Sequence, residues 1–247
     1  MFDWVLDLLF PPRCPVCGRY TEGRDMWCDS CFAGVVKPHR LPLEAEMHGL
    51  FAGGVWALGV YEAGLRDMLR QLKYDGRKNL LPGLHQYIAA GVRRLPLTGG
   101  HGRRTEAGNG SPGDGQGGLI DREGRRQAVV AVPVPLHPDR LKERGFNQSE
   151  LLFREPLAAL DIPLQGALVR CRATTPQFGL TAAERRGNLQ GAFALAEAAA
   201  GDAFIGKKVI LVDDIMTTGT TLLECARVLK SAGAVSVMGI VAASGRK

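Results

Sequence analysis

Along most of the chain, apolar runs typical of strands alternate with apolar residues at helical spacing. Continuous apolar runs at 129–134 and 209–212 are typical of strands buried in a parallel sheet, and 235–242 predicts a closing strand. The stretch 51–61, rich in Val, Ala, Leu and aromatic residues, predicts one or two further strands. Helical spacing separates these runs. The apolar faces of four predicted helices are Leu65, Met68, Leu69 and Leu72; Leu84, Tyr87, Ile88 and Val92; Leu151, Leu152 and Leu157; and Leu222, Cys225, Ala226 and Leu229. Alternating strands and helices predict an α/β fold, with a parallel sheet flanked by helices.

Residues 97–127 interrupt this pattern. Gly, Ser, Asp, Asn and Pro dominate 99–102 and 108–118, with hardly any apolar side chains. Such a composition cannot build a packed core, so we expect a disordered surface insertion within the domain. Its six basic residues either contact a polyanion or keep the loop in water.

Four of the six cysteines stand in two C-x₂-C pairs near the start of the chain. They are Cys14, Cys17, Cys28 and Cys31. Four thiolates at this spacing suit one structural Zn²⁺ with no open coordination position. A disulfide framework is the alternative, and the absence of a secretion signal makes it less favourable. Residues 1–45 are therefore expected to form an N-terminal helix and a zinc module, and 46–247 the main domain. Trp4, Val5, Leu8 and Leu9 recur at helical spacing and are expected to dock the module on its neighbour.

The stretch Val209–Thr221 carries the strongest candidate chemistry. Asp213 and Asp214 follow the apolar run and should emerge at the carboxyl end of a strand, where open α/β sheets bind ligands. The turn that follows offers hydroxyls, backbone N–H groups and a helix N-terminus, which suit a phosphate. Strands that end in Asp before a Thr-capped helix also occur without a phosphate ligand. Adjacent carboxylates are costly unless something uses them, however, and four Thr around one Gly exceed what a cap needs. The stretch therefore predicts a phosphate site.

A second loop also follows an apolar strand and leads into a helix. Arg140, Lys142 and Arg144 lie within five residues, and Asn147 with Glu150 resembles a capping box. This loop is either a diphosphate site or an exposed charged loop.

Two further segments are candidates for ligand contact. Lys73 and Tyr74 end a predicted helix and are better placed to meet a ligand than the other charges on its solvated face. The polar stretch 172–190 predicts either a flexible lid or an ordinary surface hairpin.

Composition excludes few classes. No apolar run reaches about 18 residues, so we expect no membrane span, and Met1–Phe10 carries Asp3 and Asp7 without a basic start, unlike a secretory signal. A cytoplasmic location is expected. The net charge of +6 permits an anionic partner, whether nucleic acid or a polyphosphate.

The stretch Val209–Thr221 resembles the phosphoribosyl-diphosphate (PRPP) signature of the type I phosphoribosyltransferases. With the other motifs, the chain resembles the ComF family, competence-associated proteins built on that fold. The resemblance extends over nearly the whole chain, although residues 97–127 are not part of the family pattern. It rests on the four cysteines, Leu72–Tyr74, Pro133–Pro135 with Arg144–Gln148, Pro176–Gln177 with Glu184–Arg185 and Asn188, and Leu211–Thr221.

The resemblance implies a role for each motif. It implies that Asp213 and Asp214 hold the ribose hydroxyls and, with Lys73 and Arg144, form the catalytic group. Mg²⁺ would reach the site on the diphosphate. The implied 5′-phosphate loop is Thr217, Thr218, Gly219, Thr220 and Thr221. The implied diphosphate loop contains His137, Arg140, Arg144, Gly145, Asn147 and Gln148. The implied lid contains Gln177, Arg185 and Asn188.

These implied roles suggest three functions. The first is a competence protein that binds PRPP and single-stranded DNA in the cytoplasm, beside a competence helicase. The second is a nucleobase or amine phosphoribosyltransferase of salvage or biosynthesis, and the third is a PRPP sensor without turnover. The zinc module favours the first, because a salvage enzyme would not need it.

Overall fold

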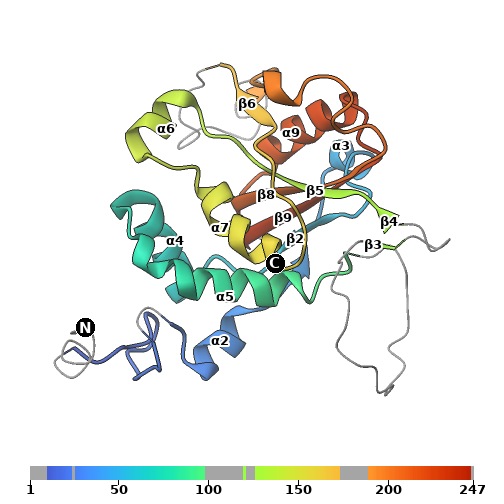
Figure 1. Ribbon diagram of the computed structural model, residues 1–247. Coiled ribbons are helices and arrows are strands. Elements are labelled where there is room, and N and C mark those ends of the chain that lie inside the picture. The colour runs from blue at the N-terminus through green and yellow to red at the C-terminus, as the bar shows by residue number, and fades with distance from the viewer. Residues whose placement is uncertain (1–9, 24–25, 98–118, 121–125, 173–188, 246–247) are drawn as a thin grey trace.

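The computed structural model describes residues 10–23, 26–97, 119–120, 126–172 and 189–245 (Figure 1). Its main sheet has five strands in the order β1-β2-β9-β8-β5. All neighbours pair in parallel except β1 and β2, which are antiparallel. The strands are β1 (His39–Arg40), β2 (Val55–Ala57), β5 (Val129–Pro133), β8 (Lys208–Met216) and β9 (Ser236–Ser244).

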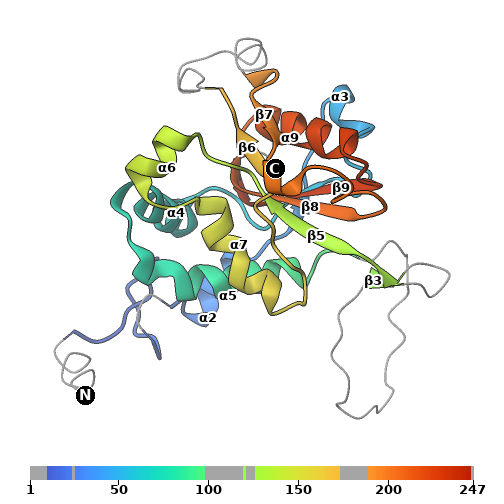
Figure 2. The same cartoon turned by 45° about the horizontal axis from the view of Figure 1, so that its top comes forward.

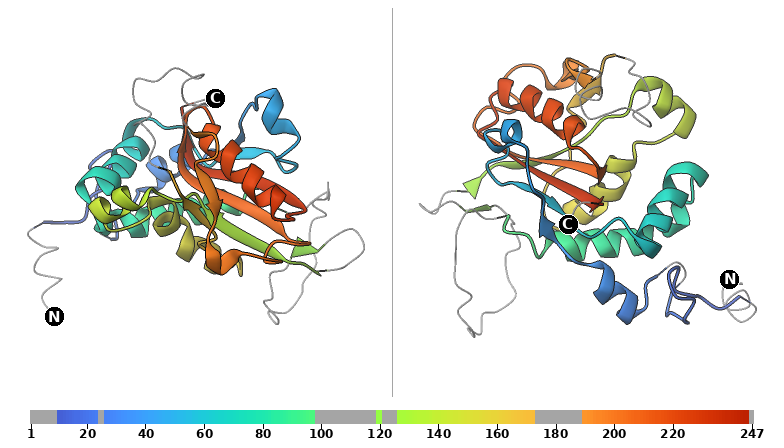
Figure 3. Two further views of the ribbon diagram at one scale, coloured as in Figure 1. Left: turned by 90° about the horizontal axis from the view of Figure 1, so that it is seen from above. Right: turned by 180° about the vertical axis from the view of Figure 1, so that it is seen from behind.

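Helices cover both faces of this sheet (Figures 1 and 3). One face carries α9 (Thr220–Ser231) and the short α3 (Ala45–His48). The other face carries α4 (Ala63–Asp75), α5 (Leu81–Val92), which follows the 3₁₀ turn η1 (Lys78–Leu80), and α7 (Gln148–Ala158). The predicted parallel sheet flanked by helices is confirmed.

The central strand β8 shows why the apolar run is continuous. Val209 and Leu211 pack on the α9 side, whereas Ile210 and Val212 pack on the side of α4, α5 and α7. Successive side chains of a strand point to opposite faces, so a strand covered on both faces needs apolar residues throughout. The two acids that follow must also point to opposite faces.

The N-terminal module packs beneath α4 and α5, and α2 (Asp29–Val35) is its helix (Figure 1). Trp27 Nε1 donates a hydrogen bond to the Gly83 carbonyl of α5 at 2.9 Å, and Arg94 Nη1 donates to the Val36 carbonyl at 2.7 Å. β1 lies within the range expected for the module but forms an edge of the main sheet. The N-terminal helix expected around Trp4, Val5, Leu8 and Leu9 lies outside the described residues.

Two small antiparallel pairs stand outside the main sheet. In the expected insertion, β3 (Leu119–Ile120) pairs with β4 (Arg126–Gln127), and 98–118 and 121–125 lie outside the described residues. β6 (Leu168–Arg170) pairs with β7 (Phe193–Leu195), which is followed by the 3₁₀ turn η2 (Glu197–Ala199).

The sequence interpretation missed three of the described helices, α2, α3 and α6, each of which has seven residues or fewer. Residues read as a charged loop after β5 contain α6 (Pro138–Arg144), which begins with Pro at its first position and ends at Gly145 with φ 79°. A seven-residue helix with no buried side chain has no apolar stripe, so helical periodicity could not reveal it. Within the described residues, no helix is long and apolar enough to cross a membrane.

Candidate functional site

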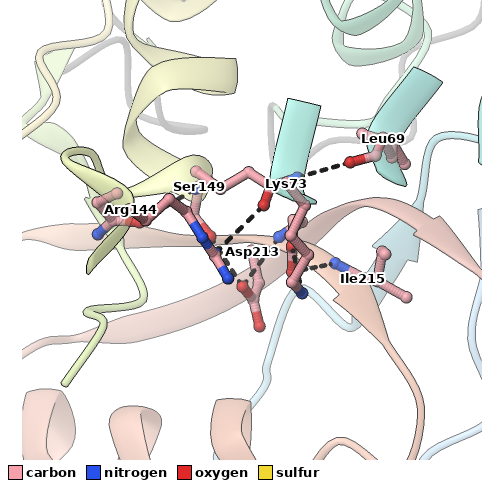
Figure 4. A network of polar contacts seen from close by, with 9 residues as sticks. Leu69, Lys73, Arg144, Ser149, Asp213 and Ile215 are labelled. Carbon is pink, nitrogen blue, oxygen red and sulfur yellow. Dashed lines mark hydrogen bonds and ion pairs between the residues drawn. The ribbon is translucent and has the colours of Figure 1, made fainter. Parts of the chain in front are cut away.

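The acid pair lies at the carboxyl end of the sheet, where β8 extends beyond its neighbour. β5 ends with Pro133 opposite Val212, while β8 continues to Met216 and still pairs with β9. From Asp213 onward, no strand among the described residues pairs with this edge of β8. The start of α7 occupies this edge, because Ser149 Oγ donates to Asp213 Oδ1 at 2.8 Å (Figure 4).

The two carboxylates point in different directions. Asp213 lines a pocket with the Thr/Gly turn on the α9 side. Asp214 accepts a hydrogen bond from Lys73 Nζ of α4 at 3.1 Å on the other side. The alternation of side chains along β8 thus gives the adjacent acids separate partners.

The Lys73–Asp214 ion pair is partly shielded from water, with side-chain exposures of 27% and 12%. Burial by itself lowers the pKa of Lys73, but attraction and hydrogen bonding to Asp214, with a contribution from Asp213, give a net upward shift. Lys73 is therefore a permanent cation at the acid pair. The sequence pattern placed it only at the end of a helix.

Asp213 is held in the opposite electrostatic situation. Burial raises its pKa to about 7, and the adjacent Asp214 charge acts in the same direction. Hydrogen bonds from the Ser149 hydroxyl and the Asp214 backbone N–H offset this only in part. A cationic or hydroxyl-bearing ligand would relieve the unfavourable charge, which suits a ribose diol together with a metal ion.

The Thr/Gly turn forms the other wall of the pocket. The pocket has a volume of about 50 Å³, and Asp213, Thr217, Thr218, Gly219 and Thr221 are among its lining residues. Gly219 precedes α9 with φ 83°, and a Cβ there would lie 2.6 Å from Met216 Cε. Thr220 begins α9, and its hydroxyl lies 3.1 Å from that of Thr218. The N-terminus of the twelve-residue α9 thus lies at the same pocket as Asp213, because Thr221 and Leu222 of its first turn also line it.

The structure brings only part of the predicted diphosphate loop toward the acids. Arg144 Nη1 lies 3.5 Å from Gln148 Oε1, and Asn147 caps α7 by accepting from the Ser149 N–H at 3.1 Å. Arg140 instead pairs with Glu143 on the exposed side of α6, and the ring of His137 caps α6 by accepting from the Asp139 N–H. Gly145 ends α6.

The predicted lid residues Gln177, Arg185 and Asn188 lie outside the described residues. The described chain around them is the β6–β7 pair. At its base, the Gly191 N–H donates to Glu224 of α9 at 3.3 Å, so the hairpin is attached to the helix that begins at the Thr/Gly turn.

The four clustered cysteines form the zinc site. Their Sγ atoms all lie within 4.8 Å of one another, and those of Cys17 and Cys28 are 3.5 Å apart. Four sulfurs bound at about 2.3 Å to one tetrahedral ion would be separated by roughly 3.8 Å, so the arrangement fits zinc. Burial raises the pKa of Cys14, but backbone hydrogen bonds from Cys28, Cys17 and Val16 outweigh it and bring the value to about 6. Burial, with hydrogen bonds and charge from the other cysteines, raises the pKa of Cys31 to about 12, so Cys14 loses its proton before Cys31 when no metal is bound.

Ser149 belongs to the candidate site but was missed by the sequence interpretation. Its hydroxyl contacts Asp213 across 64 positions of sequence, and the residue is 4% exposed. The only available signal was a small polar residue in the first turn of a predicted helix, which is also typical of an ordinary cap.

Comparison with known proteins agrees with this architecture. The phosphoribosyl transferase domain family matches residues 153–247, and the double zinc ribbon domain family matches residues 5–42. Competence protein F of Haemophilus influenzae is 43% identical over 103 residues, which cover 41% of this chain and 44% of that protein.

Two other relatives extend the comparison. DNA utilization protein YhgH of Escherichia coli is 29% identical over 225 residues, covering 91% of this chain and 80% of that protein. Competence protein ComFC of Bacillus subtilis is 36% identical over 107 residues, covering 42% and 39%. The chain thus spans less than half the length of the two competence proteins in these alignments. The zinc module, the phosphoribosyltransferase-type domain and these relatives together support the resemblance of the chain to ComF-family, type I phosphoribosyltransferase-like proteins.

Proposed function

We propose that this protein binds PRPP with Mg²⁺ and also binds single-stranded DNA, as a ComF-type component of DNA uptake in natural transformation. One observation carries the PRPP part of the proposal. Asp213, the Thr/Gly turn and the N-terminus of α9 line one pocket, while Lys73 is bound to the neighbouring Asp214.

Each group of PRPP finds a chemically suitable partner in this arrangement. The carboxylates of Asp213 and Asp214 can accept hydrogen bonds from the ribose hydroxyls. Backbone N–H groups and hydroxyls of residues 217–221 suit the 5′-phosphate. Lys73 and Arg144 supply positive charge for the diphosphate. Mg²⁺ would be held by the diphosphate and the acid pair, and when bound it neutralises the charge of the leaving group.

The chain's own residues would then stabilise charge and orient the ribose. Lys73 stays protonated, so it can stabilise negative charge that develops on a departing diphosphate without changing its own protonation state. Ser149 fixes the direction of the Asp213 carboxylate, so the ribose would be held in one orientation while a nucleophile approaches the anomeric carbon. The lid expected at Gln177, Arg185 and Asn188 would exclude water.

The surface beside Lys73 supports a nucleic-acid partner. Tyr74 is 70% exposed, and the exposed cations Arg70, Arg77 and Lys78 lie within four residues of it in the sequence. Lys78 Nζ lies 5.2 Å from the centre of the Phe146 ring, which joins this surface to the corner between α6 and α7. Exposed aromatic rings among basic side chains suit the bases and phosphates of a single strand. The names of the relatives, competence and DNA utilization proteins, point in the same direction.

A shift assay with a fluorescent oligonucleotide tests the DNA part. If about three of these cations contact phosphates, log K should fall with log salt with a slope of about −2, from the −0.7 per contact typical of single strands. A substitution of Tyr74 by Ala should weaken binding about tenfold or more through lost stacking. Phe10→Ala, another exposed aromatic residue but in the N-terminal module, is the control. Absence of salt-dependent binding by the wild-type protein would refute the DNA partner.

The salvage enzyme is the alternative, since the same pocket would serve it. Incubation with PRPP, Mg²⁺ and each nucleobase decides between them. Turnover with one base at ordinary enzyme rates, about 1 to 1,000 per second, would establish the salvage function. PRPP binding without turnover would favour the sensing form of the site.

A further inference from the structure

Gln148 lies within the loop expected to contact diphosphate, yet its side chain is directed into the protein. The residue is 1% exposed at the start of α7. Its Nε2 donates to the Leu69 carbonyl of α4 at 3.2 Å, and its Oε1 faces Arg144 Nη1 at 3.5 Å. Both ends of the amide are therefore occupied by protein groups, and neither is offered to solvent.

The choice of Leu69 as partner is informative. In an α-helix, the carbonyl of residue i accepts the backbone N–H of residue i+4, so within α4 the Leu69 carbonyl is the acceptor for Lys73. Gln148 thus binds the helical turn that ends at Lys73. The Lys73 ammonium in turn holds Asp214.

The next residue along α7, Ser149, contacts the acid pair directly. Ser149 holds Asp213, so two adjacent residues at the start of α7 act on the two adjacent acids, one directly and one through Lys73 (Figure 4). Figure 2 shows α6 and the start of α7 next to α4, at the end of the molecule where β8 leads into α9.

We propose that Gln148 is a positioning residue that ties the Arg144 side chain on α6 to the Lys73 turn of α4, so that the two cations approach one anionic ligand at a fixed separation. The Leu69 bond is the firmer of its two contacts, and the Arg144 contact is at the long end of hydrogen-bonding distance. The identity of the ligand rests on the proposed PRPP function, whereas the tie to the Lys73 turn does not. Charged groups fixed before binding lose less entropy when the ligand arrives.

Three variants separate the two contacts. Gln148→Met keeps the size of the side chain and removes both. Gln148→Glu keeps an acceptor for Arg144 but loses the donor to Leu69. Arg144→Ala removes only the contact between Gln148 and Arg144 and leaves the bond to Leu69. Gln86→Met makes the same chemical change at an exposed position of α5 and is the matched control.

Residue-resolved hydrogen exchange of the full chain, without ligand, tests the tie to α4. We expect the Lys73 amide to exchange faster in Gln148→Met and Gln148→Glu, by about tenfold for one lost buried hydrogen bond, and to be unchanged in Arg144→Ala and Gln86→Met. Unchanged exchange at Lys73 in Gln148→Met would overturn the proposal. So would equal acceleration throughout α5 and α7, because that result indicates general destabilisation.

Calorimetric titration with Mg²⁺ and PRPP tests the consequence for binding. We expect an affinity loss of about tenfold for Gln148→Met and none for Gln86→Met. Wild-type affinity in Gln148→Met would contradict the positioning role. A wild-type protein that binds no PRPP would instead refute the proposed function, and the exchange experiment would still decide the tie between Gln148 and α4.

Discussion

At the scale of single residues, the candidate site contains a carboxylate, Asp213, whose charged form is disfavoured by its surroundings. Desolvation and the neighbouring Asp214 charge raise the pKa of Asp213 to about 7. Its two hydrogen-bond donors and the charge of Lys73 compensate only in part. This electrostatic cost lowers the stability of the folded protein at neutral pH. The sequence could identify both acids, since their adjacency after an apolar run is visible. It could not show that Ser149 contacts Asp213 or that the Gln148 side chain points into the protein, because both contacts depend on where α7 packs against β8 and α4.

The pH dependence of stability follows from this pKa. In the unfolded chain the pKa of an Asp is about 3.9, so between roughly pH 4 and 7 the folded state binds more protons. The free energy of unfolding should therefore fall as pH rises through this window. Asp213→Asn removes the ionisation and should raise stability at pH 8 by on the order of 1 kcal/mol or more, with little gain at pH 4.

Denaturant unfolding of the ligand-free protein at pH 4, 6 and 8 measures this effect. Asp202→Asn, at an exposed position, is the control and should change stability little at any of these pH values. A lower stability of Asp213→Asn than wild type at pH 8 would show that the carboxylate stabilises the fold, contrary to the pKa argument.

At the scale of elements, the first turns of α7 and α9 contribute most of the candidate site around the end of β8. Gly219, which caps the start of α9, has a positive φ at which a residue with a side chain is strained. α7 begins beside the edge of β8 that carries Asp213. Periodicity predicted α4, α5, α7 and α9 because each buries an apolar stripe. It missed the short helices α2, α3 and α6, of which α2 and α6 bury no side chain. The zinc module was predictable from spacing alone, because a tetrahedral metal requires four nearby ligands whatever the surrounding fold.

Zinc binding should depend on the clustered cysteines only. Cys14→Ser should reduce zinc to well below one per chain and destabilise the module, because a small knuckle gains much of its folding free energy from the metal. Cys171→Ser, at an exposed cysteine outside the cluster, should retain one zinc. Elemental analysis of reduced protein measures both, and a full zinc complement in Cys14→Ser would remove that residue from the site.

The module should be attached to the main domain through Trp27. Trp27→Phe removes the hydrogen bond to the Gly83 carbonyl and should cost about 1 kcal/mol of stability. Trp56→Phe removes a similar bond to the Gly53 carbonyl at a more exposed site and should cost less. Chemical denaturation compares the two. Equal losses of stability in the two variants would mean that the buried hydrogen bond of Trp27 contributes no more than the exposed one of Trp56.

At the scale of the whole molecule, one sheet unites three segments that are distant in sequence. Lys73 comes from α4, Ser149 from α7 and the acid pair from β8, and they meet only because the strand order places β8 beside β5. The α/β class and the phosphate motif could be predicted from local patterns. The convergence could not, because strand order is decided by packing over the whole chain. The chain thus combines a zinc module, a basic and aromatic surface and a pocket lined by an acid and a Thr/Gly turn.

Calorimetric titration of the full chain with PRPP and Mg²⁺ tests the central claim most directly. The wild-type protein should bind one PRPP per chain, and Asp213→Asn combined with Asp214→Asn should abolish binding. Asp67→Asn combined with Asp202→Asn changes the charge equally at exposed positions and should bind as wild type does. Unchanged PRPP affinity in the Asp213→Asn and Asp214→Asn double variant would contradict the assignment of this acid pair as the PRPP site.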